Sequence, residues 1–206
     1  MKNGLQVFDH TEIADITHER NSVKLQTSDG CIIECRKLVI ACGYESQRYI
    51  PKKMEQFHST YAIASEPIRM NEFWFKNAVI WETATPYLYL RTTKDHRIII
   101  GGKDDPFSNP KKRDSLLDVK ARHLEEAFKK LFPLIPFKID FQWAGTFAST
   151  KDGLPFIGSI PQRLHTYFTL GYGGNGITFS VIAANLIRDS VSGKSNPDKN
   201  IFSFDR

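Results

Sequence analysis

Cysteine and long apolar runs are scarce in this sequence. It has three cysteines, Cys31, Cys35 and Cys42, and no C-x-x-C pair, so neither a disulfide framework nor a thiolate metal site is expected. The six histidines are isolated. No apolar stretch has the length of a membrane span, and the first ten residues lack the apolar core of a signal peptide. We therefore expect a reduced, cytoplasmic protein with no metal site and no membrane span.

An excess of charge of one sign is also absent. The 28 lysines and arginines outnumber the 23 acidic residues by a formal net charge of only +5, and they are spread along the chain. Nucleic-acid sites gather basic residues on one face, so we expect no nucleic-acid partner. What the chain does have is 206 residues, 41% of them hydrophobic, which suffice for one large or two small cores.

The amino-terminal part of the chain has the pattern of short strands. We expect strands at residues 4–8, 22–27 and 31–35, with the last two joined by a hairpin turn at residues 28–30. The continuous apolar run at residues 38–42 is typical of a strand buried on both faces, as in a parallel sheet. This strand ends at Gly43, where the backbone can approach a ligand closely.

The middle of the chain predicts a second, mostly antiparallel sheet. Longer strands rich in aromatic and β-branched residues run from about residue 58 to residue 143. One helix is expected near residues 114–132. Its apolar positions recur at helical spacing and Pro133 follows it; they are Leu117, Ala121, Leu124, Phe128 and Leu131.

One strand of this sheet has a candidate binding face. In the segment PYLYLRTT, residues 86–93, a period of two places Tyr87, Tyr89 and Arg91 on one face and Leu88 and Leu90 on the other. An aromatic and cationic face suits a small anionic substrate. An exposed strand face without a ligand explains the same pattern equally well.

The carboxyl-terminal part predicts a strand, a glycine turn and a helix. Residues 169–180, TLGYGGNGITFS, contain G-x-G-x-x-G at Gly171, Gly173 and Gly176. A dinucleotide fold needs a further strand and an acidic residue about 20 residues on, and only residues 194–206 follow the helix. The match is therefore not that fingerprint. A strand that ends in glycines and opens a helix still presents backbone N–H groups to an electron-rich ligand, although a tight turn alone is the alternative.

Three segments together resemble a known family. LVIACGYES, WAGTFASTKDGLPFIG and LGYGGNGIT are similar, in order and spacing, to the carboxyl-terminal two-thirds of the FAD-dependent oxidoreductases of the D-amino-acid oxidase, glycine oxidase and sarcosine oxidase superfamily. The resemblance covers essentially the whole chain. It implies an α+β or α/β fold: part of a Rossmann-like FAD-binding domain at residues 1–57 and 145–206, and a mostly antiparallel substrate domain at residues 58–144.

The resemblance also implies cofactor contacts. The segment at residues 171–178 would wrap the flavin ring, with the helix start aimed at the pyrimidine carbonyl, and the segment at residues 152–158 would lie beside the ring. The residues implied at the FAD are Gly43, Asp152, Gly153, Leu154, Pro155, Gly171, Gly173, Gly174, Asn175, Gly176, Ile177 and Thr178. The reaction would be hydride transfer from the carbon bearing nitrogen to flavin, for which positioning outweighs acid–base chemistry. No catalytic residue is assigned.

The sequence departs from the family at two substrate and cofactor positions. Phe147 stands where some members carry the arginine that holds a substrate carboxylate, so Arg91 with Tyr87 and Tyr89 is the alternative for that role. No cysteine lies near Gly145, where members with covalently bound flavin have one. A non-covalent FAD and a small amine or amino-acid substrate are expected.

The largest departure is at the amino-terminal end. Nothing before Lys37 has the strand and G-x-G-x-x-G turn that bind the ADP half of FAD. We therefore interpret the chain as the carboxyl-terminal portion of a longer oxidoreductase, inactive without that missing segment. A non-catalytic binding or interaction module with the same fold is the alternative. Unpaired strand edges would favour self-association.

Overall fold

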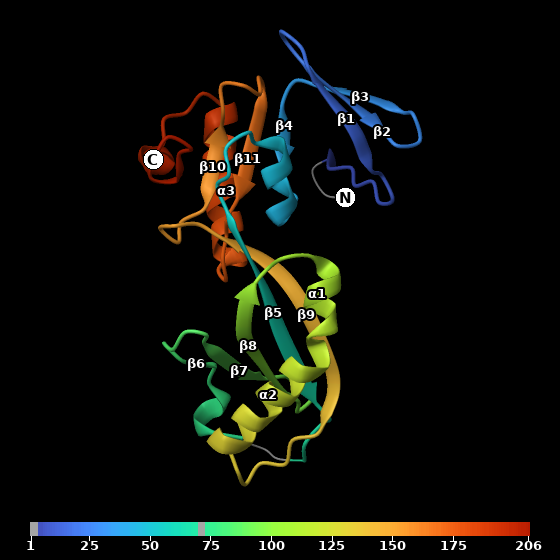
Figure 1. The fold of residues 1–206 in the computed structure, drawn as a ribbon. Helices are drawn as coiled ribbons and strands as arrows, with labels where there is room; N and C mark the ends of the chain where they lie inside the picture. The colour runs from blue at the N-terminus through green and yellow to red at the C-terminus, as the bar shows by residue number, and fades with distance from the viewer. Residues whose placement is uncertain (1–3, 70–72) are drawn as a thin grey trace. The chain divides into compact units, whose positions relative to one another are not determined.

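The chain folds into two compact units, as a computed structural model that describes residues 4–69 and 73–206 shows (Figure 1). The first unit combines Met1–Met54 with Thr150–Arg206, and the second is Glu55–Ser149. The domain boundary expected after residue 144 falls inside a continuous strand, β9 (Ile139–Ser149), which belongs whole to the second unit.

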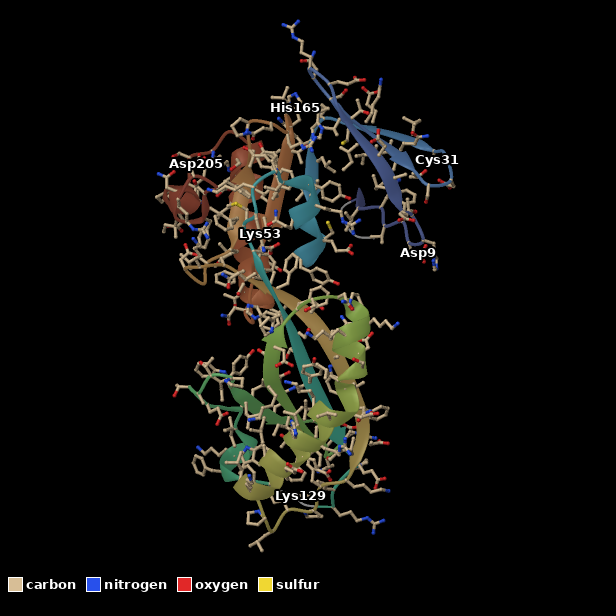
Figure 2. All side chains as sticks on the ribbon, in the orientation of Figure 1. Asp9, Cys31, Lys53, Lys129, His165 and Asp205 are labelled. Carbon is tan, nitrogen blue, oxygen red and sulfur yellow. The ribbon has the colours of Figure 1, made fainter. Side chains whose placement is uncertain are left out.

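A three-stranded antiparallel sheet lies near the start of the first unit, in the order β1 (Ile13–His18), β2 (Val23–Thr27) and β3 (Ile32–Cys35). The predicted β2–β3 hairpin is confirmed, with Gly30 at a φ of 88° in the turn and the exposed Cys31 at its tip (Figure 2). The strand predicted at residues 4–8 was wrong. Its apolar side chains are exposed, and a strand needs a neighbouring backbone to pair with.

The second sheet of this unit has the order β10 (Phe156–Ser159), β11 (Thr166–Leu170) and β4 (Leu38–Ile40). As predicted from its apolar run, β4 runs parallel to its neighbour β11. The prediction that both faces of β4 are buried was wrong: Ile40 is buried, but Val39 is 46% exposed. The helix α3 (Gly176–Val191) packs on β10, at the opposite edge of the sheet from β4. It therefore leaves one face of β4 uncovered.

Three short 3-10 helices complete the chain's regular elements among the described residues: η2 (Gly43–Tyr49), η3 (Phe75–Asn77) and η4 (Pro197–Phe202). None of the helices in this described part is long and apolar enough to cross a membrane.

The second unit is built on a five-stranded sheet, which confirms the predicted antiparallel architecture. Its order is β6 (Ile80–Trp81), β7 (Leu88–Thr92), β8 (Ile98–Pro106), β5 (Gln56–Ser65) and β9, and every neighbouring pair is antiparallel. Two helices, α1 (Pro110–Ser115) and α2 (Leu117–Leu131), follow one another along it (Figure 1).

One face of this sheet forms the core of the unit. Ala121, Leu124 and Phe128 of α2 are buried against the inward side chains of the sheet, which include Ile63 and Ile100. The predicted helix is therefore confirmed, except that Leu131 at its end is 51% exposed. Side chains of alternate parity on the same strands point to the other side, which we call the face opposite α2.

Candidate functional site

The glycine turn of the first unit joins β11 to α3. Gly171 and Gly173 have φ values of 79° and 54°, a region that strains any residue with a Cβ atom. The tight turn that we gave as an alternative therefore exists. This turn is compatible with a ligand site. The positive φ of the two glycines bends the chain sharply just before the helix begins at Gly176.

The start of α3 is open. Asn175 occupies the N-cap position, but its side chain makes no capping hydrogen bond. No atom lies within 4 Å of the place where a Cβ would stand on Gly173 or Gly174, and Ile177 is 89% exposed. The first N–H groups of a helix have no partner inside it, and here they lie at the positive end of the helix dipole, directly after glycines that carry no side chain. This arrangement suits an anionic or electron-rich group.

Sheet topology brings the predicted cofactor segments to one edge. Ile40 of β4 lies opposite Phe168 of the parallel strand β11, so Gly43 and Gly171 continue from neighbouring strands in the same direction. Phe156 at the start of β10 pairs with Leu170 at the end of β11. The residues that precede Phe156 therefore lie toward the same edge. Ligands of open α/β sheets bind at the carboxyl ends of parallel strands. Three motifs distant in sequence therefore meet where such a ligand would lie.

Asp152 is engaged within the protein. Its carboxylate accepts hydrogen bonds from the guanidinium of Arg206 at 2.7 Å and from the Leu154 backbone N–H and the Thr150 hydroxyl, each at 3.1 Å. The Arg206 hydrogen bond is the main reason that the pKa of Asp152 lies far below its usual range. Gly153 completes the turn with a φ of 73°. The carboxylate therefore fixes the shape of the loop, and its predicted contact with a flavin stays a prediction.

The three predicted substrate residues lie in the second unit, on β7 or directly before it. Leu88 and Leu90 are buried in the core, whereas Tyr87 and Tyr89 are half-buried and Arg91 is exposed. The predicted alternation is thus present. The ring centroids of the two tyrosines are 6.2 Å apart, so they form one aromatic surface on the face opposite α2.

A carboxyl group that the sequence reasoning missed lies on the same face. The pairing of β5 with β8 shifts between Ser59 and Tyr61, which makes a β-bulge in β8. Gly102 and Lys103 in this bulge have φ values of 128° and 54°. Bulges redirect side chains and occur often beside active sites. The one signal in the sequence was an acidic pair, Asp104 and Asp105, that follows an apolar strand, two glycines and Lys103.

This bulge directs the side chain of Asp104 toward the face opposite α2. Its Oδ1 atom is buried and has no hydrogen-bond partner among residues 4–69 and 73–206. Burial raises the pKa of Asp104, and the hydroxyl groups of Thr60 and Tyr87 lower it by a smaller amount. In turn, desolvation and the neighbouring carboxyl raise the pKa of Tyr87 to about 12, so Tyr87 stays a hydrogen-bond donor at neutral pH.

Phe147 also faces this side of the sheet. The imidazole of His58 stacks on the Phe147 ring with centroids 5.2 Å apart, and its Nε2 lies 2.8 Å from the Ser149 hydroxyl. An aromatic pair therefore occupies the position at which some members of the resembled family have an arginine.

Comparison with known proteins gives one family. The sequence matches the family described as DAO, FAD dependent oxidoreductase, over residues 1–190. It is 25% identical to a glycine oxidase of Bacillus subtilis (strain 168) over 196 residues, which are 93% of this chain and 50% of the relative. It is 26% identical to a gamma-glutamylputrescine oxidoreductase of Escherichia coli (strain K12) over 204 residues, 93% of this chain and 44% of the relative. The chain thus spans about half the length of these relatives.

Solved structures show the same fold. A glycine oxidase of Geobacillus kaustophilus superimposes with a TM-score of 0.75 and 20% identity, covering 96% of this chain and 52% of that one. An L-proline dehydrogenase of P. horikoshii has a TM-score of 0.75 with 21% identity, covering 97% and 54%. With the family match over most of its length and the glycine turn at the edge where such folds hold their ligand, the chain belongs to the DAO family of FAD-dependent oxidoreductases.

Proposed function

We propose that this chain supplies the flavin-ring and substrate side of an FAD-dependent oxidoreductase that oxidises an amine or an amino acid. The observation that carries this proposal is the open start of α3, which lies with Gly43 and Gly171 at the edge where β4 and β11 end. The first unit would be part of the FAD-binding domain, and the second unit the substrate domain.

The residues at this edge fit a flavin. Gly173 and Gly174 leave room in which a side chain would otherwise stand. The backbone N–H groups of Gly176, Ile177 and Thr178 would donate toward the electron-rich edge of the ring and stabilise negative charge there. FAD, when bound, accepts a hydride from the carbon that carries the substrate nitrogen. No covalent link to a cysteine is part of the proposal.

The substrate would be held by the second unit. Tyr87, Tyr89 and Arg91 offer aromatic surface and one positive charge on the face opposite α2. Their role would be to fix the position and orientation of the reacting carbon, which is the main contribution a protein makes to a hydride transfer.

We further propose that turnover needs an amino-terminal nucleotide-binding segment. The relatives are about twice as long as this chain, and no G-x-G-x-x-G turn followed by a complete dinucleotide fold occurs in it. The chain would hold the ring side of FAD, and the additional segment would hold the pyrophosphate and adenosine.

A titration with FAD tests this proposal. Gly174 lies in open space and is not among the positive-φ glycines, so Gly174→Leu adds bulk without straining the backbone. In the chain extended by an amino-terminal nucleotide-binding half, we expect saturable quenching of flavin fluorescence and co-elution on gel filtration. Gly174→Leu should weaken FAD binding at least about tenfold, which corresponds to about 1.4 kcal/mol.

Ala184→Leu is the matched control, since Ala184 lies exposed on the same helix and gains the same kind of side chain. It should leave FAD binding unchanged. Equal affinity in the Gly174→Leu protein would contradict the proposed flavin contact. If the extended protein binds no FAD at all, the non-catalytic binding module becomes the better explanation.

A further inference from the structure

The face opposite α2 has a regular composition across all five strands. Cross-strand neighbours form one row from β6 to β9 in which large aromatic residues stand on both sides of two small ones: Trp81, Tyr89, Gly101, Ala62 and Trp143. The two tryptophans of this row are 62% and 43% exposed. A Cβ atom on Gly101 would overlap the ring of Tyr89, so the tyrosine lies directly over the glycine backbone. The row thus offers accessible aromatic surface.

Asp104 adjoins this aromatic row. The backbone N–H of Lys103 donates to the Tyr87 carbonyl at 3.3 Å, which places the bulge beside the residue that precedes β7. The Asp104 carboxyl then lies between the hydroxyl groups of Tyr87 and Thr60. It is the only carboxyl in the described part of the chain that interacts with both tyrosines of the proposed substrate surface.

No cation of the described residues neutralises this carboxyl by an ion pair. The charges of His58 and Lys120 act on Asp104, but Lys120 forms its ion pair with the Asp105 carboxylate at 2.6 Å and donates to the Lys103 carbonyl at 2.7 Å, on the α2 side of the sheet. Buried charges in proteins are normally paired, because burial without a partner is costly. A half-buried carboxyl that lies beside aromatic rings and forms no ion pair with a described residue is therefore complementary to a cationic ligand, which also gains from the faces of the rings.

We propose that Asp104 binds the ammonium group of the substrate, with Tyr87 and Tyr89 against its carbon chain, so that the substrate is a cationic amine that needs no carboxylate. This inference rests on the proposed function and narrows its substrate class from amines and amino acids to amines. Arg91 lies two residues beyond Tyr89 along β7, opposite Ile99, and so at the end of the strand away from Asp104. Recognition of a carboxylate by Arg91 is not part of this binding mode.

Binding of three ligands of equal length tests the inference without flavin. All three tryptophans belong to the second unit, and Trp81 and Trp143 lie in the aromatic row, so tryptophan fluorescence reports on this surface. We expect n-butylamine to bind more tightly than n-butanol or butyrate. Asp104→Asn should weaken n-butylamine binding at least about tenfold and leave n-butanol binding unchanged, because the amide has the same shape without the charge.

The neighbouring acid provides the matched control. Asp105 precedes Pro106 in the same strand but pairs with Lys120 on the α2 side. Asp105→Asn should therefore leave the affinity for n-butylamine within about twofold of the original protein. If Asp104→Asn binds n-butylamine as well as the original chain does, or if butyrate is preferred, the inference is wrong. Unfolding curves of both variants, followed by the same fluorescence, establish that the second unit is folded.

A pH series separates charge recognition from a structural role. Burial raises the pKa of Asp104, so its negative charge is lost at a higher pH than for an ordinary carboxyl as the solution is acidified. The affinity for n-butylamine should fall in that range, and the fall should be absent in Asp104→Asn. The other titratable groups that interact electrostatically with this carboxyl, Tyr87, Tyr89, His58 and Lys120, are retained in the variant, so the comparison removes their contribution.

The two proposals fail separately. Amine binding that depends on Asp104, in a protein that binds no FAD even when extended, would contradict the proposed function and support this inference. FAD binding that depends on Gly174, together with amine binding that is indifferent to Asp104→Asn, would support the function and contradict this inference.

Discussion

Two aspartates illustrate how little a residue type says about its charge. Asp152 follows β9 and Asp104 lies near the end of β8, and their pKa values shift in opposite directions. Hydrogen bonds from a guanidinium stabilise the ionised form of Asp152, whereas burial disfavours the ionised form of Asp104. The first carboxylate shapes a loop, and the second is the one that we propose for the substrate amine. Only the surroundings, which come from distant segments, distinguish them.

The low pKa of Asp152 leads to a prediction about how the stability of its loop depends on pH. Because its pKa is lower in the folded than in the unfolded protein, its contribution to stability is complete above the unfolded pKa and is lost as pH falls through the folded pKa. Asp152→Asn should reduce the hydrogen-exchange protection of residues 150–155 several-fold at pH 7, and by progressively less below about pH 4. Mass spectrometry of exchanged peptides measures this. Arg206→Gln, which removes the same ion pair, should behave alike; unchanged protection at pH 7 would refute the role.

At the scale of elements, α2 shows why an apolar stripe predicts a helix but not how deeply each apolar side chain of that helix is buried. Phe128 is fully buried, with its ring centroid 5.4 Å from that of Phe132 and 4.6 Å from that of Phe137. Leu131 has the same helical spacing but lies 51% exposed at the end of the helix. The stripe continues past the point at which the sheet stops covering it.

Substitutions on this helix should separate the two positions. Phe128→Ala should lower the free energy of unfolding of the second unit by about 3–5 kcal/mol, because it leaves a cavity in the core. Leu131→Ala should change it by less than about 0.5 kcal/mol. Urea unfolding followed by tryptophan fluorescence measures both, since Trp74 stacks on Phe132 with centroids 5.0 Å apart. Equal effects of the two substitutions would contradict the packing described here.

At the scale of the whole molecule, the chain leaves the first unit after Met54 and returns at Thr150. In the described part of the first unit, β4 pairs with β11 along one side only, and Val39 on it is exposed. An unpaired edge with an exposed β-branched residue is a surface on which another strand can pair. We propose that this edge pairs with a strand of another copy of the chain and so causes self-association.

Light scattering over a wide range of protein concentration tests this proposal. The chain should self-associate as its concentration rises, and Val39→Lys should suppress this, because a charged side chain at an edge strand opposes pairing. Val119→Lys, at an exposed position on α2 of the other unit, is the control and should not change association. If the protein is monomeric at every concentration, β4 does not mediate self-association.

Much of the fold was accessible from the sequence because its causes are local. Helix periodicity predicted α2, apolar continuity predicted the parallel pairing of β4, and the turn at residues 28–30 predicted the β2–β3 hairpin. The same local reasoning failed at residues 4–8, where strand-like residues find no partner strand in the described chain. A strand is defined by its neighbour as much as by its own side chains.

The candidate site likewise has some features that the sequence predicts and others that only the tertiary structure shows. The sequence by itself determined the family resemblance, the glycine turn before a helix, and the alternation that sets Tyr87 and Tyr89 apart from the core, since each depends on residues close together in the chain. Tertiary structure alone decided that Asp152 is held by Arg206, 54 residues away, and that a bulge directs Asp104 toward Tyr87. Burial and charge pairing arise between distant segments, and the properties of a site follow from them.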